Sequence, residues 1–289
     1  MAEPVSPPAG RADVGEFDRD TAVQHLEESG GAESRFSAVI SPDWRAGRGP
    51  HGGYLAAMLL RALTQAVDDP GRAPRSLTIH YLRAPEPGPA EIHVRIERSG
   101  RSLSTLSARM EQEGALTALV LSAFSVPWSA PEVSEIEMPE VEPPDASREP
   151  GTLIKHGAPP FARHIVLQPR IGGMPFAGPE QRMELGGWLG LADPRPIDAL
   201  SLAFFSDALI PAPFMRSPGP NPAPTIDLTV HFRTALPRTP NPEPDELCFA
   251  RIRGGVIHEG FFEEDGVIWA ADGTVLAQSR QLALLLPRN

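Results

Sequence analysis

The stretch LTIHYLRAP, residues 77–85, occurs in this chain of 289 residues in two slightly different versions. The second version is LTVHFRTALP, residues 228–237, and the five residues from Leu77 match those from Leu228 at a constant offset of 151. Both versions are rich in β-branched and aromatic residues, which is typical of a strand. A repeated strand indicates that the fold is built from two similar halves.

A second pair of matching stretches follows in the same order. MEQEGALTALVLSAF at 110–124 resembles WAADGTVLAQSRQLA at 269–283, now at an offset of 159. The shift of eight residues fits a longer connection in the second copy, around the proline-rich RTPNPEPDE at 238–246. Two matches in one order favour duplication over chance, and two copies form a pseudo-repeat rather than a solenoid.

Each copy predicts one helix followed by strands that tight turns connect. The helices are expected over 52–67, after two glycines, and over about 196–209. Strands are expected over 75–84, 90–100, 102–114 and 115–126, and then over 225–233, 246–253, 256–264, 266–271 and 274–286. Turns are expected at Glu113-Gly114, Asp265-Gly266 and Asp272-Gly273. The class is therefore α+β, with an antiparallel sheet around each helix and the two sheets joined edge to edge.

The composition is that of a globular protein, with 41% hydrophobic and 22% charged residues. A net charge of -11 argues against a general binder of nucleic acid or of anionic membranes. The single cysteine, Cys248, cannot form an internal disulfide, which fits a reducing, cytoplasmic setting. No apolar run is long enough to span a membrane.

The chain divides by composition into four parts. Residues 1–16 lack the pattern of a secretory signal and are interpreted as a disordered tail. Residues 128–160 are rich in proline and acids, which is typical of a linker. The two copies then occupy 17–127 and 161–289.

Several catalytic motifs can be excluded from the sequence. GRGPHGG at 47–53 contains a formal G-x-G-x-x-G, but no apolar strand precedes it, so a dinucleotide site is not expected. No G-x-S-x-G elbow and no clustered metal ligands occur. Neither a cofactor nor a metal is expected.

One carboxylate stands in an apolar run. ALSLAFFSDALIPAPF at 199–214 holds two serines and a single charge, Asp207. A buried carboxylate is costly unless it is paired, hydrogen-bonded or catalytic. Either the run ends near Ser206 and leaves Asp207 in water as a cap, or Asp207 has a chemical role; the run alone leaves both open.

Five motifs resemble the double-hotdog acyl-CoA thioesterase II family. They are GPHGGYLAAMLLRAL (49–63), HYLRAP (80–85), RSGRSLSTLSARMEQEG (98–114), TIDLTVHFR (225–233) and DGTVLAQSRQ (272–281). The resemblance covers residues 17–127 and 182–287. It implies a tandem hotdog that hydrolyses acyl-CoA to free acid and CoA without metal or cofactor, and we expect a homodimer.

The resemblance also assigns roles to residues. It implies that Asp207 is the general base and that Thr225 and Gln281 orient the attacking water. Independently, Gln281 is a polar residue on the mostly apolar or small face of its expected strand. Its counterpart in the first copy is Ser122, and Asp207 falls opposite Ala56 or Ala57, so one site per chain is expected.

Substrate contacts are expected at the start of the first helix. The unpaired N–H groups of Gly52 and Gly53 could receive the thioester oxygen as it gains charge, and His51 beside them could touch the substrate. Arginines near the motifs would bind the phosphates of CoA despite the net charge. The candidates are Arg45, Arg48, Arg83 and Arg233.

Two other functions remain open. A hotdog hydratase or dehydratase would need a motif such as G-D-x-N-P-x-H, which the sequence lacks. A non-catalytic acyl-CoA binding module would have the same fold, and the sequence does not distinguish it from an enzyme.

Overall fold

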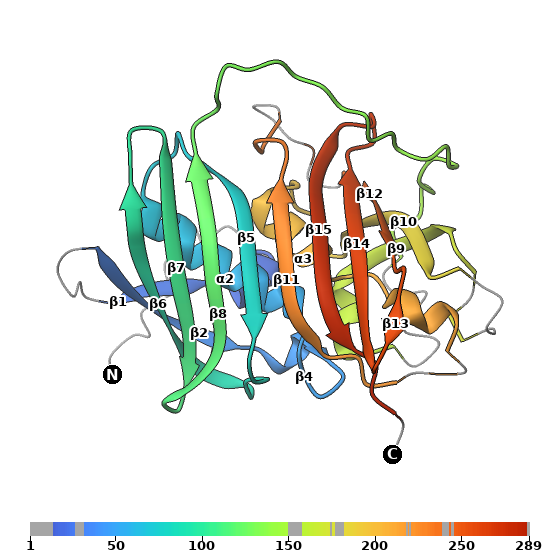
Figure 1. Ribbon diagram of the computed structural model, residues 1–289, viewed down its shortest axis with the longest axis horizontal. Helices are drawn as coiled ribbons and strands as arrows, with labels where there is room; N and C mark the ends of the chain where they lie inside the picture. Colours follow the sequence, from blue (N-terminus) through green and yellow to red (C-terminus); the bar gives the residue numbers. More distant parts are fainter. Residues whose placement is uncertain are drawn as a thin grey trace, which may run out of the picture.

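The computed structural model of this chain describes residues 14–26, 32–149, 158–173, 175–176, 182–217, 219, 221–238, 243 and 246–287. Within these ranges thirteen strands form one antiparallel sheet, and a two-stranded ribbon stands apart from it (Figure 1). The sheet strands are β1 (Val23–Leu26), β2 (Glu33–Ile40), β5 (Ala73–Tyr81), β6 (Gly88–Ser99), β7 (Leu103–Gln112), β8 (Ala115–Ser125), β9 (Ile165–Ile171), β10 (Glu184–Leu191), β11 (Thr225–Phe232), β12 (Cys248–Arg253), β13 (Ile257–His258), β14 (Phe261–Trp269) and β15 (Val275–Leu284). The separate ribbon pairs β3 (Arg45–Ala46) with β4 (Gly49–Pro50). The helices are α1 (Glu16–Asp20), α2 (Gly52–Val67) and α3 (Ala199–Phe205), with short 3-10 helices η1 (Pro42–Trp44), η3 (Pro160–His164) and η4 (Ala212–Met215).

The strand order is the same in both halves when it is read from the outer edge of the sheet inward. The first half runs β1-β2-β6-β7-β8-β5, and the second runs β9-β10-β12-β14-β15-β11. In each half the helix lies in sequence between the second strand of this order and the last, so α2 connects β2 to β5 and α3 connects β10 to β11. The repeat seen in the sequence is thus also a repeat of topology.

The two repeated stretches join the halves. They form β5 and β11, which are antiparallel neighbours, and Thr78 pairs with Thr229. The hydroxyl oxygens of this pair lie 3.1 Å apart. Because these two threonines differ by the repeat offset, they lie where a two-fold axis relating the halves would pass. The predicted edge-to-edge sheet is confirmed.

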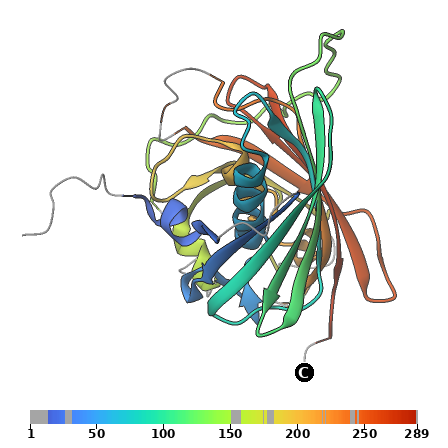
Figure 2. The same ribbon diagram turned by 90° about the vertical axis from the view of Figure 1, so that its left-hand side faces the viewer.

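α2 begins and ends at the predicted residues. From Gly53 to Leu63 nearly every residue is buried, because the sheet of the first half curls around the helix (Figure 2). Asp68 follows the last helical residue, Val67, as the C-cap. Its backbone is left-handed with φ 45°, and its N–H donates to the carbonyl of Thr64.

α3 is shorter than the predicted 196–209. It begins after Asp198, which forms a capping box with Ser201, and it ends at Phe205. After it, the N–H groups of Asp207 and Ala208 donate three residues back, to the carbonyls of Phe204 and Phe205, so the chain leaves the α-helix in a tighter turn. The prediction was wrong at this end because apolar character continues past the point where the backbone turns away.

Two of the three predicted turns are confirmed. Glu113 and Gly114 both have positive φ, as does Gly273. The turn expected at Asp265-Gly266 is wrong, because β14 runs straight through these residues. The chain turns instead at Glu259 and Gly260, with φ of 52° and 79°.

Four strands of the sheet were not predicted, and neither were the two short strands of the separate ribbon. β1 and β2 precede α2, and β9 and β10 precede α3. Each pair forms an edge of the sheet, with β1 beyond β2 and β9 beyond β10. They complete the sheet around the two helices.

After β8 the proline- and acid-rich segment arches over one end of the sheet and reaches the second half near β9 and β10 (Figure 1). Met138 and Val141 pack on a second apolar cluster on the outer face of that half, which contains Trp188, Phe249 and Trp269. Trp188 Nε1 donates to the carbonyl of Glu142 at 2.9 Å. Residues 138–148 therefore contact the second half, residues 127–137 are exposed, and 150–157 of the expected linker lie outside the described residues.

The N-terminal segment is described only from residue 14, so most of the expected tail over 1–16 lies outside the described residues. From Glu16 the chain forms α1, and Phe17 packs against Trp44 and Phe204. Among the described helices, none combines the length and the apolar character needed to cross a membrane.

Candidate active site

Asp207 lies just beyond α3 and reaches the N-terminus of α2 in the other half. The helix does end where the capping interpretation expected, but the carboxylate is only 13% exposed. Its Oδ2 accepts a hydrogen bond of 2.9 Å from the N–H of Gly53. This N–H is one of the groups that the first turn of a helix leaves unpaired. Asp207 is therefore a buried, hydrogen-bonded carboxylate rather than a cap in water.

Gly52 and Gly53 allow this close approach. A Cβ on Gly52 would lie 2.7 Å from Oδ2 of Asp207 and 3.3 Å from the ring of Tyr81. A Cβ on Gly53 would collide with the carbonyl oxygen of Phe204, at the end of α3. The two glycines thus let the start of one helix meet the end of the other.

His51 caps α2 and holds the backbone of Asp207. Its Nδ1 accepts from the N–H of Tyr54 at 3.3 Å, so Nε2 carries the proton and donates to the carbonyl of Asp207 at 2.9 Å. The ring packs on Phe161 at 4.1 Å, and burial lowers the pKa of His51. A neutral imidazole does not form an ion pair with the Asp207 carboxylate 3.7 Å away. In this geometry His51 positions Asp207.

Tyr81, at the end of β5, was not predicted as a site residue. Its hydroxyl donates to the carbonyl of Gly52 at 2.8 Å. Burial, together with the charge of Asp207, raises the pKa of Tyr81 well above its ordinary value, so it remains a phenol. The motif HYLRAP contained it, but a strand tyrosine carries no signal of its own.

The environment of Asp207 raises the pKa of its carboxyl group. Burial is the main cause, and it outweighs the opposing effect of the N–H groups of Gly53 and Gly52. A helix N-terminus stabilises a carboxylate by about 0.3–1 kcal/mol, whereas desolvating an ion costs several. Asp207 is thus a better proton acceptor than an aspartate in water.

Thr225 and Gln281 come together on neighbouring strands of the same half. The hydroxyl of Thr225 donates to Oε1 of Gln281 at 3.3 Å, and Gln281 is buried. Among the described residues, the side chain of Asp207 bonds to α2 and not directly to Thr225 or Gln281.

Glu264 is a buried carboxylate that sequence reasoning missed. It faces Gln281 across β14 and β15, and Gln281 Nε2 donates to its Oε2. Burial and the charge of Asp207 raise the pKa of Glu264 to about 7. Glu264 is the polar residue on a face of β14 whose other members, Phe262, Gly266 and Ile268, are also buried, and this alternation could have identified it. The turn predicted at 265–266 divided the strand and hid the alternation.

Comparison with known proteins places the chain in a family. The N-terminal domain of acyl-CoA thioesterases matches residues 40–126, and the C-terminal domain matches residues 137–285. The chain belongs to the acyl-CoA thioesterase family. The C-terminal match begins within the segment that packs on the outer face of the sheet.

The relatives of this thioesterase-family chain agree in fold. A hot dog fold protein of unknown function from Alicyclobacillus acidocaldarius has a TM-score of 0.81 at 24% identity and covers 96% of this chain and 100% of its own. An acyl-CoA thioesterase II from Mycobacterium marinum has a TM-score of 0.73 at 18% identity and covers 94% and 99%. An uncharacterised protein of Mycobacterium tuberculosis is 24% identical over 86% of this chain and 90% of its own.

Three of the four candidate arginines lie at the Asp207 end of this thioesterase-family fold. Arg45 is in β3 and Arg48 is in the turn between β3 and β4, just before α2. Arg83 lies near this turn, because a Cβ on Gly49 would touch its neighbour Ala84. All three side chains belong to exposed residues. Arg233 follows the other end of β11, because Asp227 near the start of that strand pairs with His80 beside Tyr81. Arg233 is therefore remote from Asp207.

The corresponding end of α3 is closed by its own residues. Asp198 accepts from the N–H of Ser201 at 2.9 Å and is bound by Arg195. Arg195 in turn contacts Asp18. The counterpart of Gln281, Ser122, donates to the carbonyl of Ser76 in β5. The described residues thus give the two helix ends different surroundings.

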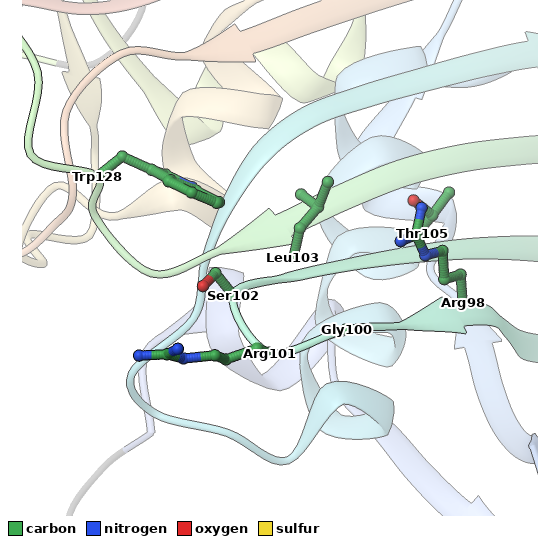
Figure 3. Close-up of a pocket in the computed structure, with 7 residues that line it drawn as sticks. All are labelled: Arg98, Gly100, Arg101, Ser102, Leu103, Thr105 and Trp128. Carbon is green, nitrogen blue, oxygen red and sulfur yellow. The ribbon is translucent and has the colours of Figure 1, made fainter.

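An open hollow lies at the opposite end of the sheet from Asp207 (Figure 3). Leu103 and Trp128 line it together with Arg98 and Arg101. Leu103 pairs with Ser125, which also pairs with Ala73 at the start of β5, whereas Tyr81 is at its end. The hollow therefore has no contact with the candidate active site. Among the described residues, no cluster of side chains is suited to hold a metal ion.

Proposed function

We propose that this protein is a tandem of two hotdogs that hydrolyses acyl-CoA to a carboxylic acid and CoA with a water activated by Asp207. One observation carries the proposal: the buried carboxylate of Asp207, from the second half, sits on the helix N-terminus of the first half. Membership of the acyl-CoA thioesterase family supports acyl-CoA as the substrate class.

The repeated topology supports the tandem. Each half has one helix and the same order of strands, and β5 and β11 join them. We assign the first hotdog to residues 17–127 and the second to 161–289, with 128–160 between them. The second hotdog contributes Asp207, Thr225 and Gln281, and the first contributes His51, Gly52 and Gly53.

The reaction begins when Asp207 accepts a proton from water. The water oxygen forms a bond to the thioester carbon, and the carbonyl oxygen takes up the negative charge. Thr225 and Gln281 orient the water by hydrogen bonds. The carbon–sulfur bond then breaks, Asp207 returns the proton to the sulfur, and CoA leaves as a thiol beside the new carboxylic acid.

The N–H of Gly53 binds first the Asp207 carboxylate and then the charged carbonyl oxygen of the thioester. In the resting site it donates to Asp207, so it is not free to receive the substrate oxygen as the sequence suggested. When Asp207 becomes protonated it binds this N–H less strongly, because the acceptor has lost its charge. The carbonyl oxygen gains charge in the same step and can take over the helix N-terminus.

Asp207→Asn tests the base directly. The substitution keeps the shape of the side chain but removes its proton affinity, so kcat should fall by about a hundredfold to ten-thousandfold while acyl-CoA binding is retained. The measurement is release of CoA thiol over acyl-CoAs of different lengths. Gln281→Ala should also lower kcat.

Ser122→Ala is the matched control, because Ser122 occupies the position of Gln281 in the other half. It should leave turnover unchanged. If Asp207→Asn turned over acyl-CoA like the wild type, the general-base assignment would be wrong. A wild-type protein that binds acyl-CoA and releases no thiol would be a binding module, and one that adds water to an enoyl-CoA would be a hydratase.

A further inference from the structure

Glu264 is a buried carboxylate beside the proposed site, and no cation among the described residues forms an ion pair with it. It is 2% exposed, and both oxygens accept hydrogen bonds from neutral groups, Oε1 from the N–H of Ala212 and Oε2 from Nε2 of Gln281. The charges that bear on it are negative, from Asp207 and from Glu263 on its own strand.

The cations on the neighbouring strands bind other residues. On β12, Arg251 and Arg253 approach Glu184, and on β15, Arg280 binds Asp265. η4 contributes only the backbone N–H of Ala212. An unpaired buried carboxylate is unfavourable for stability, so its position calls for another explanation.

That explanation lies in the amide of Gln281. An amide side chain can turn its oxygen or its nitrogen toward a neighbour, whereas an ionised carboxylate only accepts. Glu264 therefore requires the NH₂ group of Gln281 to face it. The amide oxygen then faces Thr225 and accepts its hydroxyl hydrogen at 3.3 Å. The hydrogen bonds run in one direction, from Thr225 through Gln281 to Glu264.

We propose that Glu264 is a positioning residue for the thioesterase reaction: its carboxylate fixes the orientation of the Gln281 amide and, through it, the hydrogen-bonding direction of Thr225. This inference rests on the proposed function, in which Gln281 and Thr225 hold the attacking water. Glu264 itself touches neither the water nor the substrate in this scheme.

Protonation of Glu264 would remove this constraint. A carboxylic acid can donate, so it can bind the oxygen of Gln281 as well as its nitrogen. The amide can then turn over, and Thr225 is left facing an NH₂ group instead of a carbonyl. With a pKa of about 7 for Glu264, the ordered arrangement is present above neutral pH and is lost as the pH falls through that value.

The first test measures the orientation and needs no catalysis. The side-chain amide protons of Gln281 are followed by NMR across about pH 5 to 9 in the full-length wild-type protein and in Glu264→Gln. In the wild type they should shift with a midpoint near 7, and in Glu264→Gln the shift should be absent. Amide protons that ignore pH in the wild type would overturn the proposal, even if the protein proved to release no thiol.

The second test measures turnover. In Glu264→Gln the new side chain has one acceptor for the two donors Ala212 and Gln281, so the Gln281 amide is no longer fixed. We expect kcat to fall by about tenfold to a hundredfold with KM little changed. The acid side of the kcat–pH profile should become less steep, because one of two titrating carboxylates is gone.

Asp265→Asn is the matched control, since this neighbouring carboxylate faces solvent and binds Arg280. It should leave kcat and the pH profile as in the wild type. A Glu264→Gln protein with unchanged kcat would refute the positioning role, and one with raised KM but unchanged kcat would indicate a structural role in the substrate pocket. If Glu264→Gln does not fold, the NMR titration of the wild type still decides.

Discussion

Asp207 shows how the location of one carboxylate determines its chemistry. In solvent it would be a modest helix cap, but its burial makes it hold a proton more tightly. The same two glycines that admit it to the start of α2 also bring α3 into contact. The site therefore depends on the lack of a side chain at Gly52 and Gly53 as much as on the carboxylate of Asp207.

The pH dependence of turnover follows from the raised pKa of Asp207. A general base acts when it is ionised, so kcat should be constant at alkaline pH and fall as the pH decreases through the pKa. Because burial raises that pKa above 3.8, the fall should begin at a higher pH than an ordinary aspartate would give. Initial rates of thiol release over about pH 5 to 9 measure it. A rate that falls only on the alkaline side would indicate an acid instead of a base.

Gly52→Ala tests the close approach of the two helices. The added methyl group would lie 2.7 Å from Oδ2 of Asp207, so the carboxylate must move. A displacement of about 1 Å can cost a hundredfold in rate, and we expect a loss of that order in kcat. Gly100→Ala is the control, since its methyl group would lie 3.4 Å from the nearest atom, in the turn between β6 and β7. Equal activities of the two variants would contradict this account.

Individual residues differed in how visible they were in the sequence. Gln281 stood out because it interrupts an apolar face, and the structure finds it buried there. Glu264 interrupts the next strand in the same way, but a turn placed at Asp265-Gly266 cut that strand short. Tyr81 could not be recognised, because its contact with Gly52 depends on how two distant segments pack.

At the scale of elements, periodicity predicted where helices and strands lie but not where all of them end. α2 was correct at both ends, since glycines begin it and polar residues follow it. The prediction for α3 was too long, because the N–H groups of Asp207 and Ala208 bond three residues back instead of four. β9 and β10 occupy the positions in the second half that β1 and β2 occupy in the first. They were missed because their sequence does not visibly repeat that of β1 and β2.

We expect CoA to bind near the start of α2, where exposed arginines lie in the loops. Arg83 is exposed there, and Arg233 is exposed at the other end of β11. Arg83→Ala should raise KM for acyl-CoA by about twofold to fivefold, as expected for an exposed charge, and should weaken the salt dependence of KM. Arg233→Ala is the matched control and should change neither. Identical effects of the two substitutions would show that net charge, not a local site, recruits CoA.

At the scale of the whole molecule, a segment around Met138 and Val141 covers part of the outer face of the second half, over Trp188, Phe249 and Trp269. On the first half, Leu121 of β8 is 54% exposed and Leu103 of β7 is 44% exposed, and Leu103 lines the open hollow with Trp128, which is 69% exposed. Exposed apolar side chains on a sheet face favour association.

We therefore expect a homodimer through the outer face of the first half. Leu121→Glu places a charge on this face and should convert the dimer to a monomer, because a two-fold contact repeats every substitution on both sides. Light scattering at micromolar concentration measures the mass. Asp265→Asn, on the second half, is the control and should leave the mass unchanged. A monomeric wild-type protein would contradict the expectation.

The different surroundings of the two helix ends have a consequence for how such a protein can evolve. If the halves were separate copies of one gene product, a mutation that brought in Asp207 would alter both helix ends at once. Because both halves are encoded in one reading frame, each end can mutate alone. The start of α2 can then bind the carboxylate of Asp207 from the other half, while the start of α3 is held by its own Arg195 and Asp198. In a single chain, each half is therefore free to vary separately.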